Sequence, residues 1–485
     1  MKSSIISSKH IITCAEAYLL LPVVLWICGW LQPWLAYPLT MLLIVAFICH
    51  ALRPHYPGPD LDDSPHGKQR PLFFYHLCIY AILCAIAVFM IGFDGRIMQS
   101  YDLMVRGPLY DEVIRQEWPV QMPDGCYIRY ALPFWLPAGL AASWVPSLTT
   151  PFLQLWCTLG LLLICLVLHA RLGLGRTLLF YAVIFCISPL TGTVDDVLNT
   201  IFIKDAIMGV HLRMPSPLTQ FFDTFHYFIT TCLVLSLLMA HKLPLGKLIL
   251  VTACFAVLHP MVAAQLIPFL CLLLYRDHCQ QGGVMDLAKR IIKTPELYPS
   301  IVFVALALTF YFSSGGCWFG LTFFTPHGPA FNAFGISACI TGILLTMLLP
   351  LGVYWCNHDK NLIICACICP VIMLLWYGSY IGINEWMYKY SVLYGFVIAY
   401  ALASASINRR FYMVVSLIAL TSSLPFLRVM KKKQLPDAAK NMFSVQEKNF
   451  RHEWKGTLYH PESNIYPPFT AESLHLQFLF KQHLR

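Results

Sequence analysis

The sequence predicts an all-α fold, a polytopic transmembrane helical bundle, and three observations support that prediction. First, 58% of the residues are hydrophobic and only 12% are charged, with a mean hydropathy of +0.65, which does not fit a surface facing water. Second, several apolar runs approach the roughly 20 residues that cross a bilayer as a helix. Third, nearly all of the 24 acidic residues lie between these runs, as expected because a carboxylate in hydrocarbon is costly. Only Glu16 lies inside a clear run.

Taken in order, the apolar runs predict about 11–13 spans. The clearest are Ile11–Trp30, Trp34–Leu52, Leu72–Phe93, Phe152–His169, Ala333–Tyr354, Leu362–Ile381 and Tyr412–Leu427. Further crossings are expected at Thr177–Leu190, His226–Ala240, Ser300–Ser313 and Tyr390–Ala405. The first run is too long for a signal peptide, and the second follows after only Gln32-Pro33, so the pair is interpreted as an uncleaved helical hairpin.

Lysine and arginine residues are enriched in short cytoplasmic loops, and this bias orients the chain. With the N-terminus inside, residues 1–71 form a transmembrane hairpin and a cytoplasmic loop. Residues 72–427 form a transmembrane core whose two acidic loops, 94–129 and 191–224, lie on the extracytoplasmic side and carry short interfacial helices. Residues 428–485 form a small polar tail that the same threading places on the extracytoplasmic side.

Two segments do not follow the simple alternation. Leu248–Tyr275 lies between two basic loops, so it must enter and leave on the same side and turn at His259-Pro260. Such a break is tolerated only where its backbone is buried in protein or lines a wet cavity. Tyr130–Val145 is apolar but short and contains two prolines, so a membrane-surface helix and a kinked span both stay open.

Composition also limits the function classes. The formal charge of +9 is scattered over helix ends, which favours a role in topology and in contact with anionic lipid over nucleic-acid binding. Most of the 19 cysteines lie in apolar runs and are expected to pack there as small hydrophobic residues. The chain has no phosphate-binding Walker loop, no dinucleotide fingerprint and no common hydrolase motif, which disfavours nucleotide-driven transport and those chemistries.

The loop at 94–129 is the first candidate for chemistry because acidic and basic residues alternate there with aromatics. Asp94 directly follows a span, so its carboxylate is expected at the membrane surface. If residues 100–106 form a short helix, Asp102 and Arg106 share one face, and the arginine can hold a phosphate. The alternative is an ordinary external loop with solvated charges. The candidate substrate-binding residues of this loop are Arg96, Arg106, Asp111, Glu112 and Arg129.

The loop at 191–224 begins with Asp195 and Asp196 and also contains Lys204. The aspartates either cap a short helix or form a second acidic site that binds acceptor or metal. With Asp94 they supply the oxygen ligands that Mg²⁺ or Mn²⁺ prefers, although metal dependence stays open. His259, at the predicted turn, is either a satisfied polar residue at a helix break, which we favour, or a phosphate contact.

Two segments resemble the bacterial membrane glycosyltransferases of the GT-C superfamily. The first segment carries Phe93-Asp94 after a span, Tyr101-Asp102, Leu109, Trp118-Pro119-Val120, Pro123-Asp124-Gly125 and the aromatic-proline run Tyr130–Pro137. The second is Ile383–Gly395, which resembles the late motif of that group and contributes Asn384, Glu385 and Lys389 as candidate substrate-binding residues. The architectural resemblance extends over Leu72–Leu427, whereas the motifs cover only residues 93–137 and 383–395. Lys389 and Tyr390 stand where the group's pattern leads us to expect arginine and a small residue.

The resemblance implies a GT-C-like fold and an acidic residue of the first external loop as general base or metal ligand, first Asp94 and then Asp102. It implies a sugar donor linked to polyprenyl phosphate, in contact with membrane lipid, and a glycan, lipid or protein acceptor. The expected location is the bacterial inner membrane, with the active site on the extracytoplasmic side. Independently of the family, sugar transfer needs a carboxylate to deprotonate the acceptor and cations to hold the leaving phosphate. The alternative is a secondary transporter, or a flippase or polymerase of lipid-linked glycans, without this catalytic site.

Overall fold

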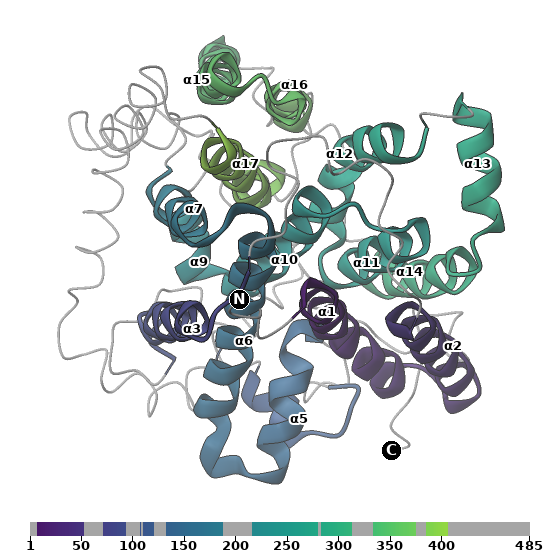
Figure 1. The fold of residues 1–485 in the computed structure, drawn as a ribbon. Coiled ribbons are helices and arrows are strands. Elements are labelled where there is room, and N and C mark those ends of the chain that lie inside the picture. The colour runs from purple at the N-terminus through teal and green to yellow at the C-terminus, as the bar shows by residue number, and fades with distance from the viewer. Residues whose placement is uncertain are drawn as a thin grey trace.

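The computed structural model describes residues 7–52, 71–93, 107, 110–120, 132–187, 216–279, 283–312, 333–374 and 385–405. Within these ranges the regular structure is helical and no strand is present (Figure 1). The helices are α1 Ser8–Trp30, α2 Pro33–Leu52, α3 Phe74–Phe89, η1 Leu132–Trp135, α5 Leu136–Trp144, η2 Pro146–Leu148, α6 Thr149–Leu172, α7 Leu174–Cys186, α9 Pro217–Asp223, α10 Phe225–Ala240, α11 Leu245–Leu258, α12 Pro260–His278, α13 Gly283–Lys293, α14 Leu297–Phe312, α15 Ala333–Asn357, α16 Lys360–Leu374 and α17 Glu385–Ser404.

The structure supports a membrane protein. Three of the described helices, Ser8–Trp30, Pro146–Leu172 and Pro260–His278, are long and apolar enough to cross a bilayer, and the bent pair α13–α14 gives a fourth if it is counted as one span. Large apolar side chains project outward from several helices, among them Met41 of α2, Ile82 of α3 and Leu155 of α6, each exposed by 60% or more. Exposed apolar side chains of this kind are typical of helices that face lipid.

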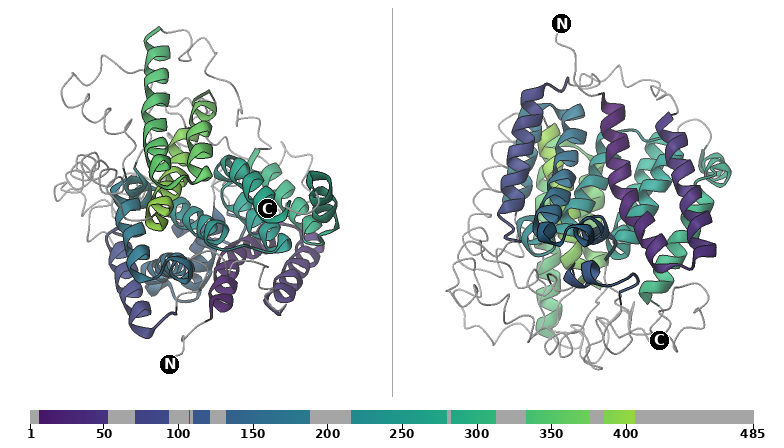
Figure 2. Two further views of the ribbon diagram at one scale, coloured as in Figure 1. Left: turned by 45° about the horizontal axis from the view of Figure 1, so that its top comes forward. Right: turned by 90° about the horizontal axis from the view of Figure 1, so that it is seen from below.

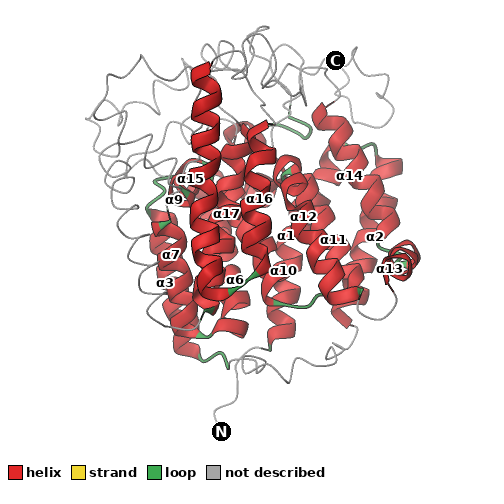
Figure 3. Ribbon diagram, turned by 90° about the horizontal axis from the view of Figure 1, so that it is seen from above, coloured by secondary structure: helices red, strands yellow, loops and turns green. Residues whose placement is uncertain are grey.

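Most of the long helices run side by side with their axes roughly aligned (Figure 2, Figure 3). Successive helices therefore bring distant chain segments together at two opposite ends. At one end, Arg176 of α7 donates to the backbone oxygen of Ser404 in α17 at 3.5 Å, and Tyr400 of α17 donates to the oxygen of Met239 in α10 at 3.1 Å. We call this the basic end, because its described residues include Arg171, Arg176, Lys242, Lys247, Arg276 and Lys360.

The opposite end is rich in aromatic side chains. Phe93, which follows α3, lies 4.8 Å from Phe225 at the start of α10, and Phe134 of η1 lies 5.9 Å from the same ring. Trp30 at the end of α1 lies 6.0 Å from Trp118. We call this the aromatic end, defined by Trp30, Phe93, Trp118, Phe134, Trp135 and Phe225. The predicted separation of basic loops from aromatic, acidic loops is therefore present wherever the flanking residues are described.

Glycine allows three helices to meet in the middle of the bundle. A Cβ added to Gly160 of α6 would lie 2.5 Å from Ile229 of α10 and 2.5 Å from the phenolic oxygen of Tyr18 in α1. That oxygen donates to the backbone oxygen of Trp156 at 3.1 Å, and the two rings stack at 3.9 Å. Such close approach of backbones is how helices gain packing contact inside a membrane. It fixes α6 between α1 and α10.

Glu16, the one acid inside a clear span, has a buried partner. Lys247 in the first turn of α11 donates to Glu16 Oε2 at 2.9 Å, and the two side chains are only 4% and 5% exposed. The residues are 231 positions apart in the chain, so the pair joins the N-terminal hairpin to the core. An ion pair at this depth is retained only when each charge neutralises the other.

The structure settles one open segment and confirms one predicted break. From residue 132 the chain forms η1, the nine-residue α5 and η2, and at about 1.5 Å per residue α5 is too short to cross a bilayer. The predicted turn at His259-Pro260 separates α11 from α12. The basic segment that follows, predicted as a loop, instead forms helix α13.

Some predictions fall on parts of the chain that the structure does not describe. These are the loop at 53–70, most of the segment 94–131, all of the segment 188–215, the run at 412–427 and the tail at 428–485. The division into 1–71, 72–427 and 428–485, the GT-C-like fold and the number of spans therefore stay predictions.

We expect the buried ion pair to stabilise the bundle only as a pair. Lys247→Met should lower the free energy of unfolding by about 3–5 kcal/mol, because it leaves the Glu16 carboxylate buried without its partner. The double variant Glu16→Leu/Lys247→Met should recover most of that loss. Thermal unfolding in detergent measures both, and equal losses in the single and double variants would contradict the interpretation.

Candidate functional site

Four of the predicted site residues lie in the described part of the chain with their side chains: Asp111, Glu112, His259 and Lys389. Glu385 is the first residue of α17, but its side chain is outside the described set. The other predicted residues lie outside the described residues: Asp94, Arg96, Asp102, Arg106, Arg129, Asp195, Asp196, Lys204 and Asn384. What the structure adds is the arrangement of the elements that flank them.

His259 and Lys389, predicted from separate segments, lie on the same tyrosine. The Lys389 ammonium is 4.1 Å from the centre of the Tyr227 ring, and the His259 ring is 4.2 Å from that ring. The ring of His226, the residue before Tyr227 in the sequence, lies 5.8 Å from the ring of His259. These four residues, which we call the His-Lys cluster, come from the start of α10, the α11–α12 junction and the second turn of α17. The cluster gathers three basic side chains at the aromatic end.

The local sequence explains the position of His259. Pro260 supplies no N–H and has the dihedral preference of a first helical residue, so α12 begins there. His259 ends α11 by donating its backbone N–H to Phe255 at 2.8 Å and starts α12 by accepting from Ala263 at 2.9 Å. Its backbone is neither helical nor fully extended, with φ −148° and ψ 77°, and its ring lies 4.2 Å from that of Tyr227.

The ring of His259 is buried and is not satisfied by the described residues. It is 1% exposed, and neither ring nitrogen makes a hydrogen bond of acceptable geometry within the described part of the chain, although the His226 backbone lies close by. A buried polar group without a partner costs about 1–3 kcal/mol. Because part of the surrounding chain lies outside the described residues, the interpretation favoured from the sequence, a satisfied polar residue at a helix break, stays a prediction.

Lys389 is held by the packing of α17. Its side chain is 9% exposed, and the next residue, Tyr390, donates to the backbone oxygen of Cys365 in α16 at 2.7 Å. Further along α17, a Cβ added to Gly395 would lie 2.3 Å from Pro217, the first residue of α9. Only glycine permits this approach, so the end of the loop at 191–224 is packed directly against the helix that carries Lys389.

Aromatic residues enclose the other side of the cluster. Trp135 lies 5.5 Å from His226 and 5.1 Å from Phe225, and Phe134 lies 6.1 Å from His226. Phe225 in turn contacts Phe93, the residue before Asp94 in the sequence. An apolar wall excludes water and strengthens any electrostatic interaction within it.

The helical turn at 110–115 carries Asp111 and Glu112 on the outer side of this wall. Tyr110 anchors it, because its ring lies 5.6 Å from Trp135 and its hydroxyl donates to the backbone oxygen of Thr149 at 3.3 Å. Burial raises the pKa of Tyr110 above its ordinary range, so the hydroxyl stays protonated and able to donate. Glu112 accepts a hydrogen bond from Gln116 one turn later. Both carboxylates are half-buried.

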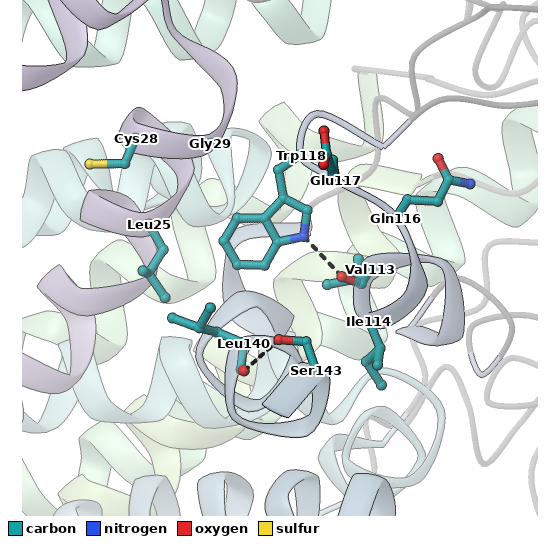
Figure 4. Close-up of a pocket in the computed structure, with 10 residues that line it drawn as sticks. All are labelled: Leu25, Cys28, Gly29, Val113, Ile114, Gln116, Glu117, Trp118, Leu140 and Ser143. Carbon is teal, nitrogen blue, oxygen red and sulfur yellow. Dashed lines mark hydrogen bonds between the residues drawn. The ribbon is translucent and has the colours of Figure 1, made fainter. Parts of the chain in front are cut away.

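Trp118 of the predicted Trp-Pro-Val motif closes a cavity beside this turn (Figure 4). The cavity measures about 370 Å³ and has a mainly apolar wall formed by Leu25, Cys28 and Gly29 of α1, Leu140 and Ser143 of α5, and Val113, Ile114, Gln116, Glu117 and Trp118. The indole N–H donates to the backbone oxygen of Val113 at 2.9 Å. Two segments far apart in the sequence, the hairpin and the acidic loop, are thereby joined at the aromatic end.

Within the described residues, no group of three or more histidine, cysteine or acidic side chains is placed to hold a metal ion. The predicted oxygen ligands Asp94, Asp195 and Asp196 lie outside those residues, so Mg²⁺ or Mn²⁺ stays a prediction. Sequence reasoning missed Tyr227, His226 and Trp135 as site residues. Trp135 lies in the aromatic-proline run Tyr130–Pro137 and His226 lies just after the polar loop at 191–224, whereas Tyr227 has no sequence signal beyond its position next to His226.

We expect Gly29→Ala to loosen the contact between α1 and Trp118. The added Cβ would lie 3.0 Å from Trp118 Cε3 and 3.2 Å from its Cβ, so overpacking should lower the free energy of unfolding by about 1–3 kcal/mol. Gly352→Ala is the matched control, since it is also helical and nothing lies within 4 Å of the added atom. Thermal unfolding in detergent should separate the two, and equal stability would argue against the contact.

Comparisons of this chain with protein-family models, with curated proteins and with solved structures found no match.

Proposed function

We propose that the chain is a membrane glycosyltransferase of the GT-C type, which transfers a sugar from a polyprenyl-phosphate donor to an extracytoplasmic glycan, lipid or protein acceptor. One observation carries the proposal: the elements that flank every sequence-predicted site segment meet at the aromatic end. Phe93, Phe225, His259 and Lys389 come from four separate segments, and a chain of ring contacts joins the first three through Trp135 and His226.

The chemistry of the His-Lys cluster fits the donor half of this reaction. A departing phosphate carries negative charge, and in a desolvated place Lys389 offers positive charge while His226 and His259 offer ring N–H donors. Because such a phosphate leaves readily, the transfer needs one base for the acceptor and not a pair of carboxylic acids. Asp94, one residue after Phe93 in the sequence, is the proposed base or the ligand of a metal that activates the acceptor, with Asp102 as second choice.

A secondary transporter is the rival function, and the Glu16–Lys247 pair is the observation that favours it. Transporters place ionisable residues within the membrane, and this pair is buried among the spans. However, Lys247 of this pair lies in the first turn of α11. Of the predicted site residues with described side chains, His259 lies at the opposite end of that helix and the others come from different segments. An interfacial enzyme therefore accounts for more of the sequence.

Asp94→Asn tests the proposed base. It keeps the size of the side chain but removes the charge and most of the basicity, so sugar transfer should fall by about 10²–10⁴-fold. Transfer from a polyprenyl-phosphate sugar is measured with the full chain in reconstituted membranes, beside Asp102→Asn and Asp111→Asn at equal protein levels. Loss of sugar transfer only in the Asp102→Asn variant would identify Asp102 as the base in place of Asp94. Full activity in all three variants would return the protein to the transporter interpretation.

Lys389→Met tests the donor site separately. The variant keeps the apolar stem on Tyr227 but removes the charge, so the KM for the donor should rise by roughly 10- to 100-fold, the scale of a hydrogen bond to a charged group. Lys389→Arg should retain most of the affinity, and Lys360→Met at the basic end is the matched control. An unchanged KM in Lys389→Met would remove the His-Lys cluster from the donor site.

A further inference from the structure

Helix α13 is oriented unlike the spans. It covers Gly283–Lys293, between the end of α12 and the start of α14, and its axis makes an angle of 79° with that of α14. Figure 1 shows α13 from the side at the edge of the molecule, whereas Figure 3, turned by 90°, shows it nearly end-on beside the upright helices. The helix therefore lies across the bundle axis, as a helix in the plane of a membrane surface does.

The sequence of α13 separates into two faces. At 3.6 residues per turn, the aliphatic side chains fall on one half of the helix and Asp286, Lys289, Arg290 and Lys293 on the other. Leu287 is buried against the protein, but Val284, Met285 and Ile292 are 68%, 73% and 58% exposed. The apolar face is thus wider than the protein surface that covers it.

The polar face is positively charged. Arg290 pairs with Asp286 at 3.1 Å, one turn away, and also donates to the backbone oxygen of His278, which ties α13 to the end of α12. Lys289 and Lys293, one turn apart, are exposed and have no ion-pair partner among the described residues. Both belong to the basic end, because α12 ends there beside Lys242.

We propose that α13 is an interfacial helix that binds anionic phospholipid in the leaflet at the basic end. Its exposed aliphatic side chains enter the acyl region, while Lys289 and Lys293 reach the phosphates of the headgroups. Each lysine near an anionic surface strengthens such binding. The exposed side chains continue onto Tyr298 and Ile301 of α14, which are 58% and 57% exposed, so lipid that covers the span also covers α13. This inference does not depend on the proposed transfer reaction.

Photocrosslinking tests the proposal with the full chain in nanodiscs. The probes are phosphatidylglycerol and phosphatidylcholine with a diazirine on one acyl chain, each diluted into the same mixed bilayer, and labelled peptides are identified by mass spectrometry. Residues 283–293 should be labelled more by the anionic probe. The double variant Lys289→Gln/Lys293→Gln should reduce the ratio of anionic to zwitterionic labelling by about 10-fold or more.

The matched control is Lys242→Gln/Lys360→Gln, which removes the same charge from exposed positions at the same end and should leave the labelling ratio at 283–293 within about twofold. Size-exclusion elution shows that each variant remains folded, and the α13 lysines are exposed enough for neutral substitution to be tolerated. Equal labelling by both probes in the wild-type chain would overturn the anionic preference. Absence of lipid labelling at Val284, Met285 and Ile292, with crosslinks to a second protein chain instead, would overturn the lipid assignment.

Discussion

The bilayer core offers no water, so every backbone N–H and C=O within it must be paired inside the chain. This constraint accounts for the helical architecture and for the position of the breaks. The break at His259 lies among packed aromatic rings at one end of the bundle. Polar groups are therefore sorted to two ends. Glu16 and Lys247 obey the same constraint, since each supplies the charge that the other needs.

Ring packing and close glycine contacts hold the described parts of the aromatic end together. Trp118 packs closely against Gly29, and Pro217 packs closely against Gly395, so elements separated by many residues approach without a gap. Such packing fixes side chains without adding polar groups that a bound phosphate would have to displace. Lys389 remains as a buried cation on an aromatic face, an arrangement that is stronger when water is excluded.

Much of this fold could be predicted, because apolar runs and basic loops are local signals. The break at His259 followed from the need to return Leu248–Tyr275 to one side, and the structure has it there. The partner of Glu16 could not be predicted, since nothing local links residues 231 positions apart. Helix α13 has the periodicity of an amphipathic helix, but the positive-inside rule uses only its basic residues and predicts a cytoplasmic loop. The convergence of His259 and Lys389 on Tyr227 needed the tertiary packing of three helices.

The division of charge at the candidate site limits the mechanisms available to it. The described cluster at the aromatic end contains Lys389, His226 and His259, so its positive charge and ring N–H donors suit it to hold an anion. In the proposed reaction the base comes from the adjoining acidic segments. Phe93, the residue before Asp94 in the sequence, already contacts the wall of the cluster through Phe225. In the proposed reaction, binding of the leaving group and activation of the acceptor fall to different chain segments, the first to helices fixed in the bundle and the second to the loops that join them.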